Sequence, residues 1–397
     1  MTWRSLPPVR RAVPVRRGRM ESLRSFERFF GMRWVSFYPS GTAALHHAIQ
    51  SCAIRASTRT PEVIVPAYGC PNLIAACVRA SVRPRLVDVA SAGWGYCIEE
   101  LARCICPDTV AIVAVNLLGT GDTAAALRPL CRARGITLIQ DSAQHLPRVE
   151  TAWAGDYVVL SFGRGKPLNL LQGGALLSAQ APPEATRAEA PRVPLSARLL
   201  TGRVAAYAFN LLTRPEFYGA VTRLPGTGLG AVAYAPLRHI APLPDRFARG
   251  ASAAFEDYRP APSYRRALWE PVLPDWRRWG IEEIRSGDGE PDPEPLRLAL
   301  LAPSRRRRDA LVDRLARAGL GASRLYGAEL PRIAGVPDII RTQGPFPNAS
   351  LLADRLFTLP THSLVSADTV RQAHRIVRAW CREHAAPAHD SSDICGH

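Results

Sequence analysis

The stretch GDYVVLSFGRGKPLNLLQGGALLS, residues 155–178, decides the fold class of this chain of 397 residues. It holds two short apolar runs, at 157–162 and 173–178, and turn-forming residues lie between them. Short runs rich in Val and Leu that are bounded by glycine are typical of buried strands. The segment therefore predicts two strands, joined by a loop that contains two glycines and Lys166.

Similar apolar runs alternate with helical patterns upstream of this segment. The strand-like runs lie at 34–37, 62–68, 83–89, 109–115 and 136–140, and the main helix-like runs lie at 41–54, 71–80 and 123–135. Val- and Ile-rich runs between amphipathic helices indicate a mostly parallel sheet that is covered on both faces. We therefore expect an α/β fold.

The chain is longer than one ordinary core allows, so two domains are expected. We predict a basic, exposed N-terminal arm over 1–30, a large domain over 31–255 and a small C-terminal α/β domain over 256–390. Within the large domain, residues 180–255 depart from the strand and helix pattern and form a divergent middle segment. The small domain is indicated by renewed alternation at 296–302, 304–320 and 356–360, followed by a helix that starts near Ser366.

Lys166 is the only lysine among the 51 Lys and Arg residues, so the other 50 are arginine. Arginine carries charge and binds carboxylate or phosphate as lysine does, but it does not readily lose its proton. A lysine in a desolvated site can act as a nucleophile, and Schiff-base formation is the first candidate. Chance retention of the lysine is the alternative, and the neighbouring residues decide between the two.

Polar residues follow several of the predicted strands, at the edge where parallel sheets bind ligands. The Ser-Gly-Thr at 40–42 suits an anion, although these residues also simply cap a helix. Asp141 can hold a ring nitrogen protonated, with Gln144 near the same ligand, or it can cap a short turn. Ser161 and Arg164 suit a phosphate. These strand ends therefore predict one binding site on a single edge of the sheet.

Together these groups meet the requirements of pyridoxal phosphate. That cofactor needs a phosphate cup, an acid for its ring nitrogen, a partner for its ring hydroxyl and an amine. A Walker phosphate loop is excluded, because its GxxxxGK[ST] spacing is absent and Pro167 follows the lysine. Asn116 follows another predicted strand and His145 follows Gln144, so both are further candidates for the pocket.

Four segments resemble the DegT/DnrJ/StrS family, which are fold-type-I pyridoxal-phosphate aminotransferases that act on nucleotide-linked keto sugars. They are YPSGTAALHHAI (38–49), VIVPAYGCPNLIAACVRASVRPRLVDV (63–89), LLGTGDTAAALRPLCRARGITLIQDSAQ (117–144) and the segment 155–178 quoted above. The resemblance is strong over about 31–180 and weaker over 295–385. It implies a seven-stranded, mostly parallel sheet, a smaller C-terminal α/β domain, and a homodimer with sites at the subunit interface.

The resemblance also implies roles for single residues. Lys166 matches the Schiff-base lysine, Asp141 the partner of the pyridine nitrogen, and Gln144 the residue near the ring hydroxyl. The residues that match the family's phosphate binders are Gly41, Thr42 and Ser161. The implied substrates are a nucleotide-linked keto sugar as acceptor and an amino acid, glutamate first, as donor.

Two positions depart from the family pattern. The family usually places an aromatic residue against the cofactor ring where this sequence has Cys70, which offers less stacking area; Tyr68 is a possible substitute. The family's Gly-Tyr-Asn-x-Arg-like stretch, whose Asn reaches the neighbouring subunit's phosphate, is missing, and VTRLPGTGLGAVAY (221–234) occupies its place. We therefore expect a changed subunit contact and a changed sugar pocket.

The net charge of +17 attracts polyanions such as nucleic acid, anionic lipid or phosphorylated substrates. No nucleic-acid module is recognisable and the aromatic residues are not interleaved with basic runs, so arginine enrichment on solvated faces is preferred. No segment approaches the roughly 20 apolar residues of a membrane span. A helix within 195–220 that carries Arg198, Arg203 and Arg214 allows contact with a membrane surface, but ordinary packing is favoured.

The nine cysteines include no CxxC pair, which favours a reduced, cytoplasmic protein. Cys104 and Cys106 are a weak metal signal without a nearby His, and no metal site is expected. The first 20 residues lack the apolar core of a secretory signal. Composition therefore favours a cytoplasmic protein without a metal site.

Two hypotheses of different class follow. The first is a transaminase that moves an amino group, by resemblance from glutamate, to a nucleotide-linked keto sugar in polysaccharide or secondary-metabolite biosynthesis. The alternative is a cofactor-binding relative with diverged or lost catalysis that acts in regulation or as a scaffold. Cys70 and the missing middle motif support the alternative, whereas Lys166 supports the enzyme. A basic binding protein for anionic polymers or membranes is a weaker third hypothesis.

Overall fold

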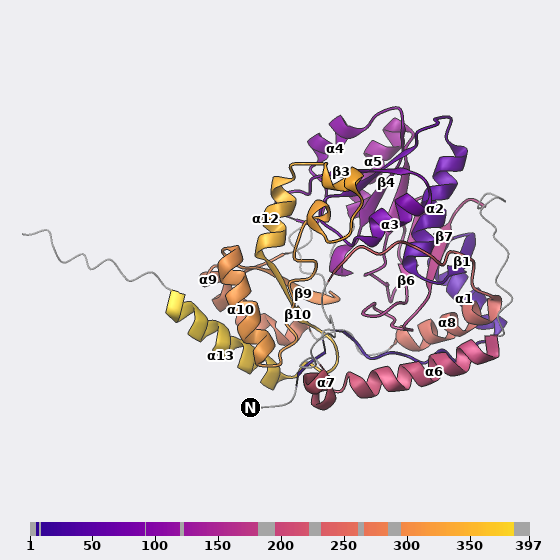
Figure 1. The fold of residues 1–397 in the computed structure, drawn as a ribbon. Helices are drawn as coiled ribbons and strands as arrows, with labels where there is room; N and C mark the ends of the chain where they lie inside the picture. The colour runs from indigo at the N-terminus through magenta and orange to yellow at the C-terminus, as the bar shows by residue number, and fades with distance from the viewer. Residues whose placement is uncertain are drawn as a thin grey trace, which may run out of the picture.

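The chain forms one large and one small sheet, each with helices packed against it (Figure 1). The computed structural model describes residues 5–7, 9–91, 93–119, 123–181, 195–221, 232–260, 266–284 and 295–384. The strands of the large sheet are β1 (Trp34–Tyr38), β2 (Glu62–Pro66), β3 (Arg83–Val87), β4 (Thr109–Val115), β5 (Thr137–Asp141), β6 (Tyr157–Ser161) and β7 (Gly174–Ser178).

The large sheet has the strand order β1-β7-β6-β5-β4-β2-β3. Neighbours from β3 to β6 run parallel, and β7 pairs antiparallel with both β6 and β1. The buried runs of β2 and β4 are apolar on both sides because helices cover both faces. The expected α/β fold with a mostly parallel, seven-stranded sheet is confirmed.

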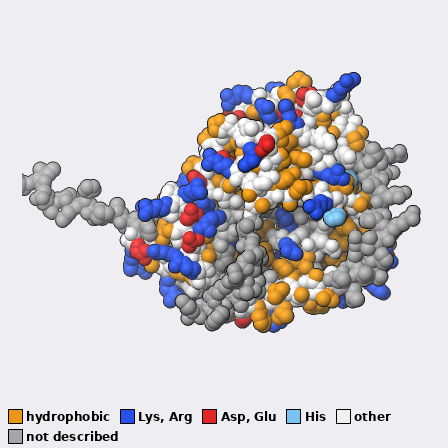
Figure 2. Space-filling model, in the orientation of Figure 1, with side chains coloured by type: hydrophobic (Ala, Val, Ile, Leu, Met, Phe, Trp, Pro, Cys, Tyr) orange, Lys and Arg blue, Asp and Glu red, His pale blue; other side chains and the backbone are white. Residues whose placement is uncertain are grey.

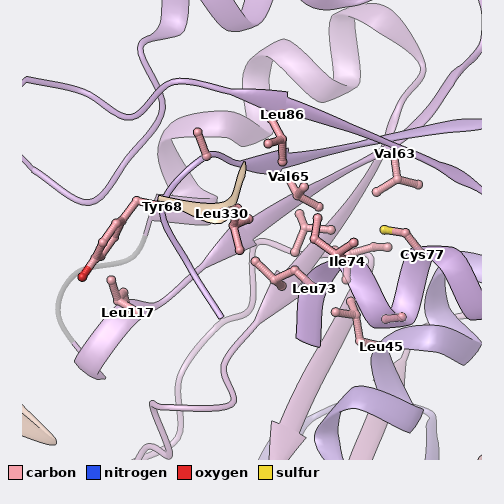
Figure 3. Close-up of a cluster of buried hydrophobic side chains, with 14 of the residues drawn as sticks. Leu45, Val63, Val65, Tyr68, Leu73, Ile74, Cys77, Leu86, Leu117 and Leu330 are labelled. Atoms are coloured by element: carbon pink, nitrogen blue, oxygen red, sulfur yellow. The ribbon is translucent and has the colours of Figure 1, made fainter. Parts of the chain in front are cut away.

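Helices α2 (Gly41–Arg55) and α3 (Asn72–Arg79) cover one face of this sheet. Helix α2 is rich in buried alanine, which lets it pack closely against β6 and β7. Figure 3 shows Val63 and Val65 of β2 against Leu73 and Ile74 of α3. This packing fixes the start of α2 beside the carboxyl end of β6.

The opposite face is covered in two halves. Helices α4 (Ile98–Cys104) and α5 (Thr123–Arg134) lie over β2 to β5. Helices α1 (Met20–Phe30) and α8 (Asp245–Tyr258) lie over β1, β6 and β7. There the rings of Phe26, Phe30 and Phe255 have centroids 4.5–5.2 Å apart. This aromatic cluster ties residues 20–30 to a segment more than 200 residues away.

The small sheet is antiparallel, with the order β10-β9-β8. Its strands are β8 (Glu282–Glu283), β9 (Arg297–Leu301) and β10 (Leu356–Pro360). Its helices are α9 (Leu273–Arg278), α10 (Arg305–Arg317) and α13 (Ala367–His384). Trp269, Trp276 and Trp380 fill its centre. Helices α11 (Asp338–Arg341) and α12 (Pro347–Arg355) contribute buried residues to a hydrophobic cluster of the large sheet. The boundary proposed at 255 and 256 falls inside α8, and the domain limits stay a prediction.

Residues 5–7 and 9–18 pack against the rest of the protein, so the expectation of an exposed arm is wrong for this part; residues 1–4 lie outside the described residues. Leu6, Ala12 and Val15 are buried, and the backbone N–H of Val13 donates to Asn169 O at 2.7 Å. The segment is basic overall, but apolar residues are spaced among its arginines, and these apolar residues pack onto the large domain. Residues 20–30 form helix α1. We call residues 5–18 the N-terminal strap.

The middle segment contains α6 (Leu195–Leu212) and α7 (Pro215–Val221). Val204, Tyr207 and Leu211 follow helical spacing and are 48–64% exposed, and Figure 2 shows a hydrophobic surface over this helix. The helix therefore presents an apolar face to solvent, against the expectation of ordinary packing. Among the described residues, no helix is both apolar and long enough to cross a membrane. Residues 222–231, in the stretch that replaces the family motif, lie outside the described residues.

Much of the positive charge is dispersed rather than gathered into one stripe. Over the helices of the small sheet, Figure 2 shows Lys and Arg side chains beside Asp and Glu. Arg324 pairs with Asp309 and Asp313, and Arg314 pairs with Glu383. This arrangement supports solvated faces as the main origin of the net charge.

Candidate functional site

The loop after β6 brings Lys166 to a cavity of about 230 Å³ at the carboxyl edge of the large sheet. Gly165 has φ +73°, in the left-handed region that favours glycine. The backbone N–H of Lys166 donates to Gly163 O at 3.2 Å, and Phe162 and Gly173 are joined by a 2.8 Å backbone hydrogen bond. The two glycines thus let the loop turn back on itself and place the lysine at the strand end.

Gly41 begins α2 directly against Ser161. A Cβ atom at Gly41 would lie 2.7 Å from Ser161 Cβ, so a side chain does not fit without movement. The hydroxyl of Ser40 caps the helix by accepting from the N–H of Ala43 at 3.1 Å. Gly41, Thr42 and Ser161 all line the cavity. The helix start and the strand end therefore form one concave wall suited to an anion.

Asp141 ends β5 and lines the same cavity. Burial raises the pKa of its carboxyl group, while the N–H of Ala143 and the charge of Lys166 act in the opposite direction. Oδ1 accepts from Ala143 N at 2.9 Å. A carboxylate in such surroundings is stabilised by a cationic ligand atom, because the cation offsets part of the cost of burying its charge.

Asn116 follows β4 and carries a buried polar atom that has no partner. Its Nδ2 donates to Ser142 Oγ at 3.0 Å. Its Oδ1 is buried without a hydrogen bond to the described part of the chain, and the residue lines the cavity. Buried acceptors are normally satisfied, so this oxygen indicates that a donor from a ligand or water belongs here.

Gln144 and Tyr326 meet at the other side of the cavity. Gln144 Nε2 donates to the Tyr326 hydroxyl at 2.9 Å, and Gln144 Oε1 accepts from the N–H of Leu118 at 2.8 Å. Burial raises the pKa of Tyr326 well above its usual value, so the hydroxyl stays protonated. Tyr326 comes from the C-terminal part of the chain and yet lines the cavity.

Cys70 lines the cavity at the position expected to face the cofactor ring. Burial raises the pKa of its thiol, and the charge of Lys166 opposes this shift. Tyr68 does not line the cavity, although it was considered as a substitute. Its ring lies 5.6 Å from that of Tyr326, measured between centroids. The aromatic side chain at this site is therefore Tyr326 rather than Tyr68.

A second cavity of about 340 Å³ adjoins the first. Both cavities are lined by Gln144, Arg164, Lys166 and Tyr326. The second is also lined by residues of the N-terminal strap and of the small sheet, including Arg10 and Arg297. Lys166 therefore stands where the two cavities meet.

The structure brings the sequence-predicted residues together in the first cavity. These are Gly41, Thr42, Cys70, Asp141, Gln144, Ser161 and Lys166. Asn116 is there too, whereas His145 is not among the lining residues. Sequence reasoning missed Asn72 and gave no reason to place Tyr326 inward. Asn72 begins α3 two residues after Cys70, and this position at a helix start near the site was a usable sequence signal. No sequence signal indicated that Tyr326 points into the cavity.

Residues 20–192 match the model of the DegT/DnrJ/EryC1/StrS aminotransferase family. Curated relatives include GDP-perosamine synthase of Vibrio cholerae, 27% identical over 38% of this chain and 42% of that protein. Another is 3-amino-5-hydroxybenzoate synthase of Amycolatopsis mediterranei, 30% identical over 40% of this chain and 42% of that protein. The chain thus spans about two fifths of these relatives' length, and the family resemblance is confirmed over that part.

Solved structures share the fold over most of the chain. DesV of S. venezuelae, in complex with a ketimine intermediate, has a TM-score of 0.65 at 20% identity and covers 91% of this chain and 88% of that one. PseC of Helicobacter pylori has a TM-score of 0.65 at 13% identity and covers 92% and 91%. At these identities the likeness shows the fold alone.

Proposed function

We propose that this chain is a pyridoxal-phosphate-dependent aminotransferase. One observation carries the proposal: the only lysine of the chain lines one cavity with Asp141, Gln144 and the wall formed by Gly41 and Ser161. The matched family and the relatives named as transaminases or synthases of amino sugars support it. The matched residues 20–192 include every residue that lines this cavity except Tyr326.

The first cavity fits the cofactor in its chemistry. The wall of Gly41, Thr42 and Ser161 would hold the phosphate, because a helix start and a hydroxyl suit an anion. Asp141 would hold the ring nitrogen protonated, and Asn116, whose buried Oδ1 has no hydrogen bond to the described residues, lines the same cavity. Cys70 would lie against the ring with less contact area than an aromatic residue.

Bound pyridoxal phosphate supplies an electron sink for the bonds of the substrate's amine-bearing carbon. The protein's own groups do the rest. Lys166 would bind the cofactor covalently and, once released, would carry a proton to and from the substrate carbon. Asp141 would keep a positive charge at the ring nitrogen. Gln144, held by Tyr326 and Leu118, would orient the ring hydroxyl.

Borohydride reduction tests the cofactor assignment directly. We expect the purified chain, after incubation with pyridoxal phosphate, to show a visible absorption band that reduction removes, with the label on Lys166 in a peptide digest. A single labelled lysine is unambiguous here, because the chain has no other. Absence of the band, or a label only at the N-terminal amine, would overturn the proposal.

The proposed acceptor is a nucleotide-linked keto sugar, and the proposed donor is an amino acid, glutamate first. Relatives named as a GDP-perosamine synthase and as transaminases of dTDP-linked amino sugars support the acceptor. Biosynthesis of a polysaccharide or secondary metabolite in the cytoplasm is the proposed setting. Amination assays across nucleotide keto sugars, with glutamate, glutamine and aspartate as donors, would identify the pair. Cofactor binding without turnover across this panel would favour the regulatory or scaffold alternative.

A homodimer is the proposed assembly. The apolar face of α6, with Val204, Tyr207 and Leu211 exposed, offers a surface that a second copy would cover. We expect light scattering after size exclusion to give twice the chain mass of 43.3 kDa. A monomeric mass at micromolar concentration would contradict the dimer.

A further inference from the structure

The second cavity differs from the first in the charge of its wall. Arg10, Arg164, Arg297 and Lys166 contribute positive charge to it, and His362 lines it as a neutral ring. Among the described residues that line this cavity, none is Asp or Glu. A concave wall with several cationic groups and no carboxylate of its own suits an anionic ligand.

Arg297 at the start of β9 is the most firmly held of these cations. Its Nε donates to Thr358 Oγ1 at 2.7 Å, and its Nη2 donates to Gly321 O at 2.6 Å. The residue is 7% exposed. Burial lowers the pKa of its guanidinium only to about 10, so it stays charged at neutral pH. The group is therefore a fixed positive charge inside the protein.

Arg10, on the N-terminal strap, also lines this cavity. Its Nη1 donates to Pro167 O at 3.3 Å, next to Lys166, and its backbone O accepts from Asn169 Nδ2 at 2.9 Å. Ala12 exchanges two 2.7 Å hydrogen bonds with Asn210. A Cβ at Gly165 would lie 2.9 Å from Val9 Cγ1. The strap is thus packed onto the lysine loop and forms a permanent part of the cavity wall.

We propose that the second cavity binds the carboxylate of the amino-acid donor, with Arg297 and Arg10 as its cationic ligands. This inference rests on the proposed transaminase function and adds the location and the residues of the donor site. It also assigns a binding role to the first residues of the chain, which the composition alone marks only as basic.

The position of Lys166 favours a carboxylate over a diphosphate. In an α-amino acid the carboxylate is bonded to the same carbon that carries the amine. A carboxylate bound by Arg10 would lie beside the lysine loop, because Arg10 donates to Pro167 O and lines one cavity with Arg297 and Lys166. The diphosphate of a nucleotide-linked sugar lies beyond the sugar ring from the reacting carbonyl. His362, whose pKa burial lowers to about 4, is neutral and does not add a titrating charge at neutral pH.

Calorimetry with two anions on the full chain loaded with pyridoxal phosphate tests this inference. The probes are glutarate, a dicarboxylate without an amine, and inorganic pyrophosphate. We expect glutarate to bind, and Arg10→Gln and Arg297→Gln each to weaken its binding by about tenfold, the scale of one lost charge-assisted hydrogen bond. The control is Arg11→Gln, which changes an exposed arginine on the same strap and should leave the dissociation constant unchanged.

Three results would overturn the inference. The first is that the wild-type chain does not bind glutarate, and the second is that neither variant weakens glutarate binding. The third is that pyrophosphate binds, requires both arginines, and is not displaced by glutarate. Arg297→Gln removes a buried anchor, so circular dichroism checks its fold, and Arg10→Gln carries the test if it is unfolded. Because this readout needs no turnover, a failed borohydride label at Lys166 would refute the proposed function without deciding the anion site.

Discussion

The two cavities that meet at Lys166 have walls of different origin. Apart from Tyr326, the lining of the first comes from residues 40–166, at strand ends and in the loops and helix starts that follow them. The second combines the N-terminal strap, the lysine loop and residues 296–362. The first is built where strands of one sheet end together; the second exists only because distant segments pack together. The two therefore differ in how they respond to substitution.

Loss of Lys166 is expected to have the largest effect, because this amine serves both cavities. We expect Lys166→Arg to lower transaminase turnover by at least ~10³-fold, since arginine neither forms the covalent link nor readily gives up its proton. The fold should persist, as judged by circular dichroism and gel filtration. Turnover within tenfold of wild type would remove the basis for the proposed function.

Asp141→Asn tests the first cavity alone. A neutral amide cannot hold the cofactor's ring nitrogen protonated, so we expect turnover to fall by about 10²- to 10³-fold. Cofactor should still bind covalently to Lys166, and glutarate should still bind in the second cavity. Steady-state kinetics and calorimetry on the same preparation measure both. An equal fold loss in turnover and in glutarate affinity would mean that the two cavities do not act separately.

Gly41→Ala probes the phosphate wall by shape. The added Cβ would lie 2.7 Å from Ser161 Cβ. We expect cofactor affinity to fall about tenfold and stability by about 1–3 kcal/mol, the usual cost of overpacking. Gly95→Ala is the matched control, because nothing lies within 4 Å of its Cβ position. Fluorescence titration and thermal unfolding measure the two effects, and equal losses in both variants would contradict the shape argument.

Tyr326→Phe sharpens the boundary between the cavities. It removes the hydroxyl that accepts from Gln144 at 2.9 Å and keeps the ring. Loss of one such hydrogen bond costs about 1 kcal/mol, so we expect kcat/KM to fall about fivefold. Adding Gln144→Ala to the Tyr326→Phe variant should lower kcat/KM by a smaller factor than Gln144→Ala lowers it in the wild-type chain. Fully additive losses in this double-mutant cycle would show that the two side chains act independently.

The last prediction concerns pH, stability and the wall of the second cavity. Burial first, and then the charges of Arg297 and Arg10, lower the pKa of His362 to about 4, although its hydrogen bond to Pro7 O opposes them. The unfolded chain thus takes up this proton at a higher pH than the folded chain. Stability is fully present above about pH 6.5 and falls as the pH drops towards 4, by up to about 1.4 kcal/mol per unit.

Urea unfolding between pH 4.5 and 7.5 measures this dependence. His362→Gln should flatten the slope without removing it, because burial also lowers the pKa of His46 to about 4. Identical slopes in the two chains would show that His362 does not contribute. Wild-type stability that rises towards pH 4.5 would contradict the sign itself.

Residues 31–180 were predictable because each element carries its own signal. The apolar runs of β2 and β4 lie between turn residues, and parallel topology then places the residues after them on one edge. The sequence alone therefore predicts that Asp141 and Ser161 lie at one site. The N-terminal strap was misread, because its arginines suggested exposure while Leu6 and Val15 carried the packing. Burial depends on what packs against a segment, and composition does not report it.

The sequence by itself determined the α/β fold, the family resemblance and the residues of the first cavity, because strand periodicity and local motifs are encoded within short stretches. Only the tertiary structure decided that Tyr326 meets Gln144, that Tyr68 does not line the cavity, and that Arg10 and Arg297 line one cavity. Gln144 and Tyr326 are 182 positions apart in the chain, and Arg10 and Arg297 are 287 positions apart. No local pattern encodes such contacts, since they are set by how the strap and the two sheets pack together.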